Sequence, residues 1–200
     1  MIEKIADINF PTFSGIRCLM MPYIQGDSCS IPEVYAPYRD IVDSIFVERG
    51  KIGFLTIDES MVQLGNPHRG ARSRYPRALH TEAGKRDRAF VWGTWGSNFN
   101  VTLDRGVRVL LANNLERSCA IWDADQEDTT LDGDIGHMAD DYPYSEGIYL
   151  SPGQVYDIGI FTPHESLPVS RNFDRQFLRI VSSEVHGRED YFTQNPLCPL

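Results

Sequence analysis

The chain has 200 residues, of which 42% are hydrophobic and 24% are charged, and its formal net charge is −9 at pH 7. This length and composition are typical of one globular domain, so we expect a single domain over residues 1–200. The acidic balance disfavours general nucleic-acid binding, which would need a basic face. The four cysteines include no Cys-x-x-Cys pair, which disfavours a closed zinc site.

Residues 1–50 are expected to form an arm followed by one or two helices. Prolines and glycines interrupt the arm, and residues 16–21 are its best candidate for a strand. Apolar residues recur at helical spacing within residues 31–48, although Pro37 is expected to break this segment. The first residues lack the basic start and apolar run of a signal peptide, and no apolar run is long enough to cross a bilayer. We therefore expect a cytoplasmic protein that does not contact membranes.

From residue 51 the sequence changes to short apolar runs separated by turn residues, a pattern typical of an all-β core. The expected strands are residues 52–57, 79–81, 90–95, 99–103, 107–112, 119–124, 147–150, 154–161 and 176–182. An acidic segment over residues 126–144 is expected to form a loop. We therefore predict a β sandwich, jelly roll or barrel over residues 51–182, followed by a tail over residues 183–200.

Two histidines and a glutamate occur in the order of a 2-His-1-carboxylate iron site. His80 and Glu82 are separated by one residue, so in a strand both side chains point to the same face. His164 is expected where a predicted strand ends, far downstream. Three such ligands occupy one face of an octahedral Fe(II) ion and leave the other face open for substrate and oxygen. The pattern predicts iron ligation, and a surface histidine beside a surface glutamate is the alternative reading of the first two residues.

Two arginines of the last predicted strand are candidates for binding an anionic co-substrate. Alternation places Arg175 and Arg179 on the same face of that strand. A buried guanidinium is costly unless it meets an anion, and its planar fork matches a carboxylate. Arg175 is therefore the expected anchor for the distal carboxylate of 2-oxoglutarate, with Arg179 as the alternative.

The order of these features resembles the Fe(II)/2-oxoglutarate-dependent oxygenases of the double-stranded β-helix fold, over roughly residues 53–181. The chain has Glu82 where most of that family has aspartate. Several short motifs resemble uncharacterised members carried by phages and bacteria: Thr56-Ile57-Asp58-Glu59, Gly65 with His68-Arg69, Cys119 with Trp122-Asp123, and residues 162–168. The resemblance implies a mainly β fold with a jelly-roll or cupin-like core, metal ligation by His80, Glu82 and His164, and co-substrate binding by Arg175.

Four further residues are candidates for lining a substrate pocket, namely His68, Arg69, Trp92 and Asn113. The expected substrate is a small molecule or a side chain of another protein. Two other functions fit the same pattern. One is a non-catalytic jelly-roll module with a binding or structural role, such as a phage component. The other is a cupin-type metalloprotein that does not use 2-oxoglutarate.

Overall fold

The computed structural model describes residues 2–66, 75–86, 89–92, 107–127, 133–182 and 192–199. For residues 83–86 and 89–92 it describes the backbone alone. Within these ranges the chain is mainly β, as the sequence predicts. None of the described helices is long and apolar enough to cross a membrane.

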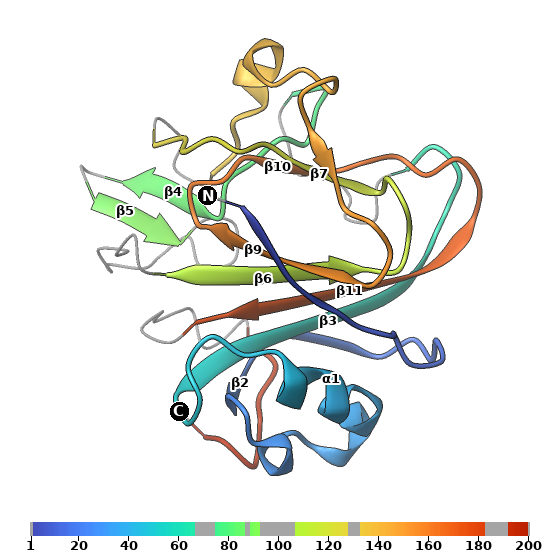
Figure 1. Cartoon of the computed structure of the whole chain (residues 1–200), viewed down its shortest axis with the longest axis vertical. Helices are drawn as coiled ribbons and strands as arrows, with labels where there is room; N and C mark the ends of the chain where they lie inside the picture. The colour runs from blue at the N-terminus through green and yellow to red at the C-terminus, as the bar shows by residue number, and fades with distance from the viewer. Residues whose placement is uncertain are drawn as a thin grey trace.

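Six antiparallel strands form the largest sheet, in the spatial order β1-β9-β6-β11-β3-β2 (Figure 1). Their bounds are β1 Glu3–Asp7, β2 Arg17–Ile24, β3 Ile52–Val62, β6 Arg108–Asn113, β9 Gln154–Gly159 and β11 Phe173–Val181. Strand β11 lies inside this sheet, where it pairs with β3 over its whole length and with β6 over its second half. A strand in this position contributes side chains to both faces of the sheet.

Two smaller sheets accompany the large one. The first has three antiparallel strands in the order β10-β7-β8, with bounds β10 His164–Ser166, β7 Cys119–Ile121 and β8 Ile148–Tyr149. The second is the hairpin of β4 (Ala83–Arg86) and β5 (Ala89–Trp92). The three-stranded sheet matters for function because β10 begins at His164, one of the predicted ligands.

One face of the large sheet is covered by the N-terminal helical segments. These are the 3-10 helices η1 (Ser28–Ser30) and η2 (Glu33–Tyr38) and the short helix α1 (Arg39–Ser44). Figure 1 shows α1 beside β2 and β3. Tyr38 and Ile41 of this layer share an apolar cluster with Leu178 and Ile180 of β11.

The other face of the large sheet meets the three-stranded sheet. Phe177 and Val181 alternate with the helix-facing residues of β11 and belong to a second apolar cluster, which also contains Cys119 and Ile121 of β7. The side chains of β11 that share this face, including the two arginines, therefore lie between the sheets.

The helix predicted over residues 31–48 is wrong in its extent. Helical structure covers η2 and α1 only, and Pro37 lies inside η2. Proline has no backbone N–H and fixes φ near −65°, which disfavours one continuous α-helix through this position. The expectation of one or two N-terminal helices is thus met by short segments.

Most of the predicted strands are confirmed with shifted ends, but three predictions need comment. Residues 79–81 form no strand, and His80 instead makes isolated bridges to Asp134 and His164. Strands β1, β4 and β10 were not predicted. The strand predicted over residues 99–103 lies outside the described residues.

Part of the predicted tail packs on strand β2. The Thr193 amide donates to the Leu19 carbonyl at 2.8 Å, and the Leu19 amide donates to Thr193 Oγ1 at 2.8 Å. The buried Asn195 Nδ2 donates to the carbonyls of Pro22 and Ser30. The tail therefore holds the β2 backbone next to Met20, a residue that contacts the candidate site.

Candidate metal centre

His80 and His164 are brought together by their own backbones. They are cross-strand partners in an antiparallel bridge, in which the His80 amide donates to the His164 carbonyl at 3.0 Å and the His164 amide donates back at 2.9 Å. Directly opposed residues of an antiparallel pair carry their side chains on the same face. The two imidazole centroids are 4.0 Å apart as a result.

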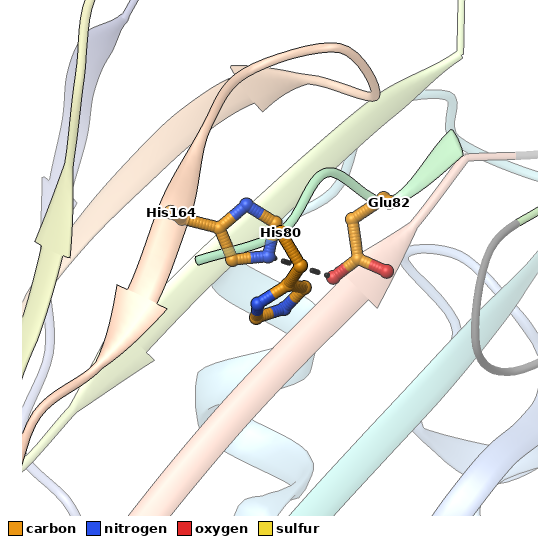
Figure 2. A group of neighbouring side chains, drawn as sticks. All are labelled: His80, Glu82 and His164. Carbon is orange, nitrogen blue, oxygen red and sulfur yellow. Dashed lines mark ion pairs between the residues drawn. The ribbon is translucent and has the colours of Figure 1, made fainter. Parts of the chain in front are cut away.

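Glu82 completes the cluster two residues after His80. One ligand atom from each of the three side chains lies within 4.8 Å of the other two. Figure 2 shows the three side chains pointing toward one another, and His164 Nε2 lies 3.4 Å from Glu82 Oε1, a contact that is an ion pair only when the imidazole is protonated. The structure thus brings together the three residues predicted as ligands, although Glu82 lies before β4 and not in a strand with His80.

Both histidines are oriented with Nε2 available for a metal. His80 Nδ1 lies 2.9 Å from the Ala78 carbonyl, and His164 Nδ1 lies 2.9 Å from the Thr162 carbonyl. A carbonyl oxygen only accepts a hydrogen bond, so in a neutral imidazole Nδ1 carries the proton and Nε2 carries the lone pair. Hydrogen bonding of the second ring nitrogen is the usual arrangement of metal-ligating histidines.

An ion pair between the partly buried Arg77 and the buried Glu165 joins the His80 segment to β10. Arg77 donates from Nε and Nη2 to Glu165 Oε2 at 2.9 and 2.7 Å, and from Nη1 to the carbonyls of Ala139 and Tyr142. Tyr144 donates to the other oxygen of Glu165 at 3.2 Å. Arg77 precedes His80 by three residues and Glu165 follows His164 directly, so this pair fixes the spacing of the two histidines.

Arg77→Met is expected to lower the free energy of unfolding by about 3 kcal/mol, because the buried Glu165 carboxylate loses its cation. Urea denaturation measures the change. Lys4→Met is the control, since Lys4 pairs with Asp7 on the surface and its loss is expected to change stability by less than about 0.5 kcal/mol. Equal effects of the two substitutions would contradict the role given to Arg77.

Glu82 is held by Arg179, and both side chains are buried. Arg179 Nη1 donates to Glu82 Oε1 at 2.8 Å and to Oε2 at 2.9 Å. Burial by itself raises the pKa of a carboxyl, but the charge of Arg179 and the contacts of His164 outweigh burial and hold the pKa of Glu82 well below its usual range. Glu82 is therefore a carboxylate at neutral pH.

Arg175 is also buried, at 2% exposure, but it has no comparable partner. Its Nη1 donates to Ser166 Oγ at 3.1 Å, while its Nε has no hydrogen-bond partner among the described residues. Within the same ranges no carboxylate lies at ion-pair distance from Arg175. Burial lowers the pKa of Arg175 to about 10, so the guanidinium is charged at neutral pH.

Asn113 is a second buried side chain with a donor that has no partner. Its Oδ1 accepts from the Leu115 amide and from Ser118 Oγ, whereas its Nδ2 has no partner among the described residues. Asn113 is the cross-strand partner of Phe177 and so shares a face with Arg175, two residues from Phe177 along β11. Arg175 Nε and Asn113 Nδ2, which have no partner among the described residues, therefore lie on the face of the large sheet that meets the three-stranded sheet.

The remaining predicted residues are less informative. His68 and Arg69 lie outside the described residues, and Trp92 is described only by its backbone in β5. His164 was expected at the end of the strand over residues 154–161, and this is wrong. That strand ends at Gly159, a turn follows, and His164 starts β10 in the other sheet.

Two residues of the site were missed at the level of sequence. Ser166 contacts Arg175 and shares a face of β10 with His164, but β10 is too short for this pattern to be recognised in the sequence. No pattern in the sequence identifies Met20 as a residue of the site. Its φ of 46° lies in the left-handed region at a register shift of β2, and a methionine there is rare.

Comparison with known proteins adds no assignment. No protein-family model matches the chain, and no curated protein matches its sequence significantly.

Proposed function

We propose that the chain is an Fe(II)- and 2-oxoglutarate-dependent oxygenase with a double-stranded β-helix core. The observation that carries the proposal is the convergence of His80, Glu82 and His164 between two sheets that also enclose the charged, under-compensated Arg175. The three converging side chains suit a metal ion, and Arg175 suits an anion. This fold family combines a metal ion and an organic anion in one site.

The order of the strands supports the proposed fold. From β3 onward the chain passes repeatedly between the large and the three-stranded sheet, although β4 and β5 form a hairpin of their own and β7 and β8 follow each other in the three-stranded sheet. Strands β3, β6, β9 and β11 lie in the large sheet, whereas β7, β8 and β10 lie in the small one, and His80 bridges to β10. Such repeated passage is what winding two sheets into a double-stranded helix requires. The four large-sheet strands are neighbours in the order β9-β6-β11-β3.

The donor set supports a divalent metal of the ferrous type. Two imidazoles and one carboxylate are a ligand set of non-haem iron sites, and three ligands leave coordination positions open. Each imidazole is oriented by a backbone carbonyl so that Nε2 faces the cluster. No side chain of the triad has to move far, because the ligand atoms already lie within 4.8 Å of one another.

Buried donors without a partner among the described residues support the binding of an organic anion. A carboxylate accepts two hydrogen bonds from a guanidinium, and Arg175 offers an Nε that has no partner among the described residues, while its Nη1 donates to Ser166 Oγ. Asn113 Nδ2 is a further donor on the same face. Arg175, Ser166 and Asn113 would bind the distal carboxylate of 2-oxoglutarate, and the apolar surroundings formed by Phe177 and Cys119 exclude water from it.

When bound, iron and 2-oxoglutarate would supply oxidative chemistry with dioxygen as the oxidant: 2-oxoglutarate would be decarboxylated to succinate and CO2, with one oxygen atom going to succinate and the other to the hydroxylated C–H bond of the substrate. The residues of this chain hold and orient these groups. The proposed substrate is a small molecule or a side chain of a partner protein.

Metal binding tests the proposal directly. The purified chain is expected to bind one Fe(II) or Mn(II) ion and, with Fe(II) and dioxygen, to convert 2-oxoglutarate to succinate and CO2. His164→Ala is expected to lower the metal affinity by at least about 100-fold, because it removes one of three ligands. His137→Ala is the control, since His137 is exposed and lies outside the triad.

Calorimetric titration with Mn(II), under nitrogen and without 2-oxoglutarate, measures the affinity of each variant. A wild-type chain that binds no divalent ion either with or without 2-oxoglutarate would overturn the proposal. Metal binding that 2-oxoglutarate leaves unchanged, with no succinate released, would replace it by a cupin-type metalloprotein.

A further inference from the structure

Arg179 contacts the only charged ligand of the proposed metal site. One nitrogen, Nη1, lies 2.8 and 2.9 Å from the two oxygens of Glu82, and neither side chain has meaningful access to solvent. In a water-excluded site the attraction between such charges is strong and is not screened by salt. A divalent ion that enters the triad must therefore share Glu82 with a cation that is already in contact with it.

The surroundings of Arg179 keep its guanidinium in this position. Its Nη2 donates to Met20 Sδ at 3.2 Å and to Thr56 Oγ1 at 3.4 Å, and Thr56 Oγ1 also accepts from the Met20 amide. Met20 reaches this place through its left-handed backbone, which costs energy in a residue other than glycine. Non-glycine residues in such conformations cluster at functional sites.

The other described carboxylates near the site do not replace the negative charge of Glu82 that Arg179 offsets. Glu165 is engaged by Arg77, and Asp58 is engaged by Arg17 at 2.9 Å. Asp134, the second backbone partner of His80, accepts the Gly136 amide through Oδ1 and does not belong to the ligand cluster. Glu82 and Arg179 thus form a neutral pair, and neutral imidazoles complete a ligand set without net negative charge.

We propose that Arg179 offsets the charge of Glu82, so that the triad binds a divalent ion weakly by itself and gains affinity when an anionic ligand binds beside the metal. The inference rests on the proposed metal site and adds its regulation. Because binding free energies are reciprocal, the metal and the anion must strengthen each other by the same factor. Arg179 makes that factor larger, since without the anion no negative charge remains to balance the ion.

The inference also gives a reason for glutamate at this position. Glu82 is one methylene longer than aspartate, and its carboxylate reaches both His164 Nε2 at 3.4 Å and Arg179 Nη1 at 2.8 Å. Arg179 is accordingly a positioning residue, which acts on the metal through Glu82.

Two substitutions of Arg179 separate its charge from its bulk. Arg179→Met removes the charge and is expected to raise the affinity for Mn(II) alone by about 10- to 100-fold, a change opposite in sign to, and of the same size as, the loss that follows removal of a partner that supports a metal ligand. Arg179→Lys keeps the charge and is expected to stay closer to the wild type. Calorimetric titration with Mn(II), with and without saturating 2-oxoglutarate, measures both the affinity and the coupling factor.

The outcomes distinguish this inference from the proposed function. If neither the wild type nor Arg179→Met binds Mn(II), the metal site itself is wrong. If the wild type binds Mn(II) and Arg179→Met binds it equally or more weakly, the site stands and the role of Arg179 is wrong. A smaller effect of 2-oxoglutarate on Mn(II) affinity in Arg179→Met than in the wild type supports the coupling, whereas an equal effect overturns it.

Arg179→Met leaves the Glu82 carboxylate buried without its cation, and the variant can be unfolded in the absence of metal. In that case circular dichroism during a Mn(II) titration gives the answer. Recovery of folded signal at Mn(II) concentrations that do not stabilise the wild type against heat supports the inference, because the metal then takes the place of Arg179. Failure of Mn(II) to restore the fold overturns it.

Discussion

Glu82→Met is expected to lower the free energy of unfolding by about 3–5 kcal/mol, because it leaves the guanidinium of Arg179 buried without its counter-ion. Arg179 is 0% exposed, and its Nη1 makes both of the hydrogen bonds that Glu82 accepts from it. The remaining partners of that side chain in β2 and β3, Met20 and Thr56, carry no charge. Methionine has a volume close to that of glutamate, so the loss reports on charge and not on a cavity.

The double variant Glu82→Met/Arg179→Met is expected to recover most of this loss. A buried ion pair that is replaced on both sides by apolar residues often leaves stability unchanged or increased. Urea denaturation of the two single variants and the double variant, in the presence of a chelator, completes the cycle and excludes stabilisation by metal. Glu33→Met is the control, since Glu33 pairs with Arg39 at the surface with its side chain 87% exposed, and its loss is expected to cost at most about 0.5 kcal/mol.

Additive effects of the two single substitutions would contradict the picture of one coupled pair. So would a Glu82→Met variant as stable as the control. Either result would mean that Arg179 is compensated from another side.

The predictable part of this fold is the part that depends on local pattern. Strand β6 was predicted as residues 107–112 and observed as Arg108–Asn113, because a run of apolar residues between turns specifies a buried strand. β10 has only three residues, and no periodicity is measurable over so short a segment. The segment around His80, which meets β10 at His164, forms isolated bridges and no strand. The residues that it bridges to, Asp134 and His164, are distant in the sequence.

The candidate site was predictable in its chemistry but not in its electrostatics. The His-x-Glu spacing and the later His164 were sufficient to name three residues that the structure brings within ligand distance. The two arginines of β11 were equivalent by alternation, because both fall on one face. Their difference arises from residues far away in the sequence: Glu82 reaches Arg179, whereas Arg175 meets only Ser166. No local pattern carries that information.

Strand pairing over long separations decides the remainder. The Arg77–Glu165 pair joins residues 88 positions apart, and the contact of Arg179 with Met20 spans 159 positions. Each contact depends on the register between segments, because a one-residue slip would turn the side chains of one strand to the opposite face. Sequence reasoning located the candidate metal ligands because their spacing is that of a known ligand set, and it missed the supporting contacts because their spacing follows no such pattern.

Arg175→Met is expected to have the opposite effect on stability from Glu82→Met. Arg175 is buried and charged, its Nε has no partner among the described residues, and its one hydrogen bond goes to a neutral hydroxyl of Ser166. Removing an under-compensated buried charge is expected to raise the free energy of unfolding by about 1–3 kcal/mol. A gain of this kind, at a site that should bind a ligand, is typical of a residue kept for function.

The same substitution is expected to weaken 2-oxoglutarate binding by about 100-fold or more, since truncating one partner of a buried charged contact costs about 3 kcal/mol. Urea denaturation of the metal-free chain measures stability, and calorimetric titration of the Mn(II)-loaded chain measures affinity. Arg49→Met is the control, because Arg49 is exposed and lies over the ring of Phe46, away from the triad. An Arg175→Met variant that is less stable than the wild type and still binds 2-oxoglutarate would show that Arg175 is a structural residue. A variant that is more stable and no longer binds the anion would identify the residue whose burial this fold maintains at the expense of stability.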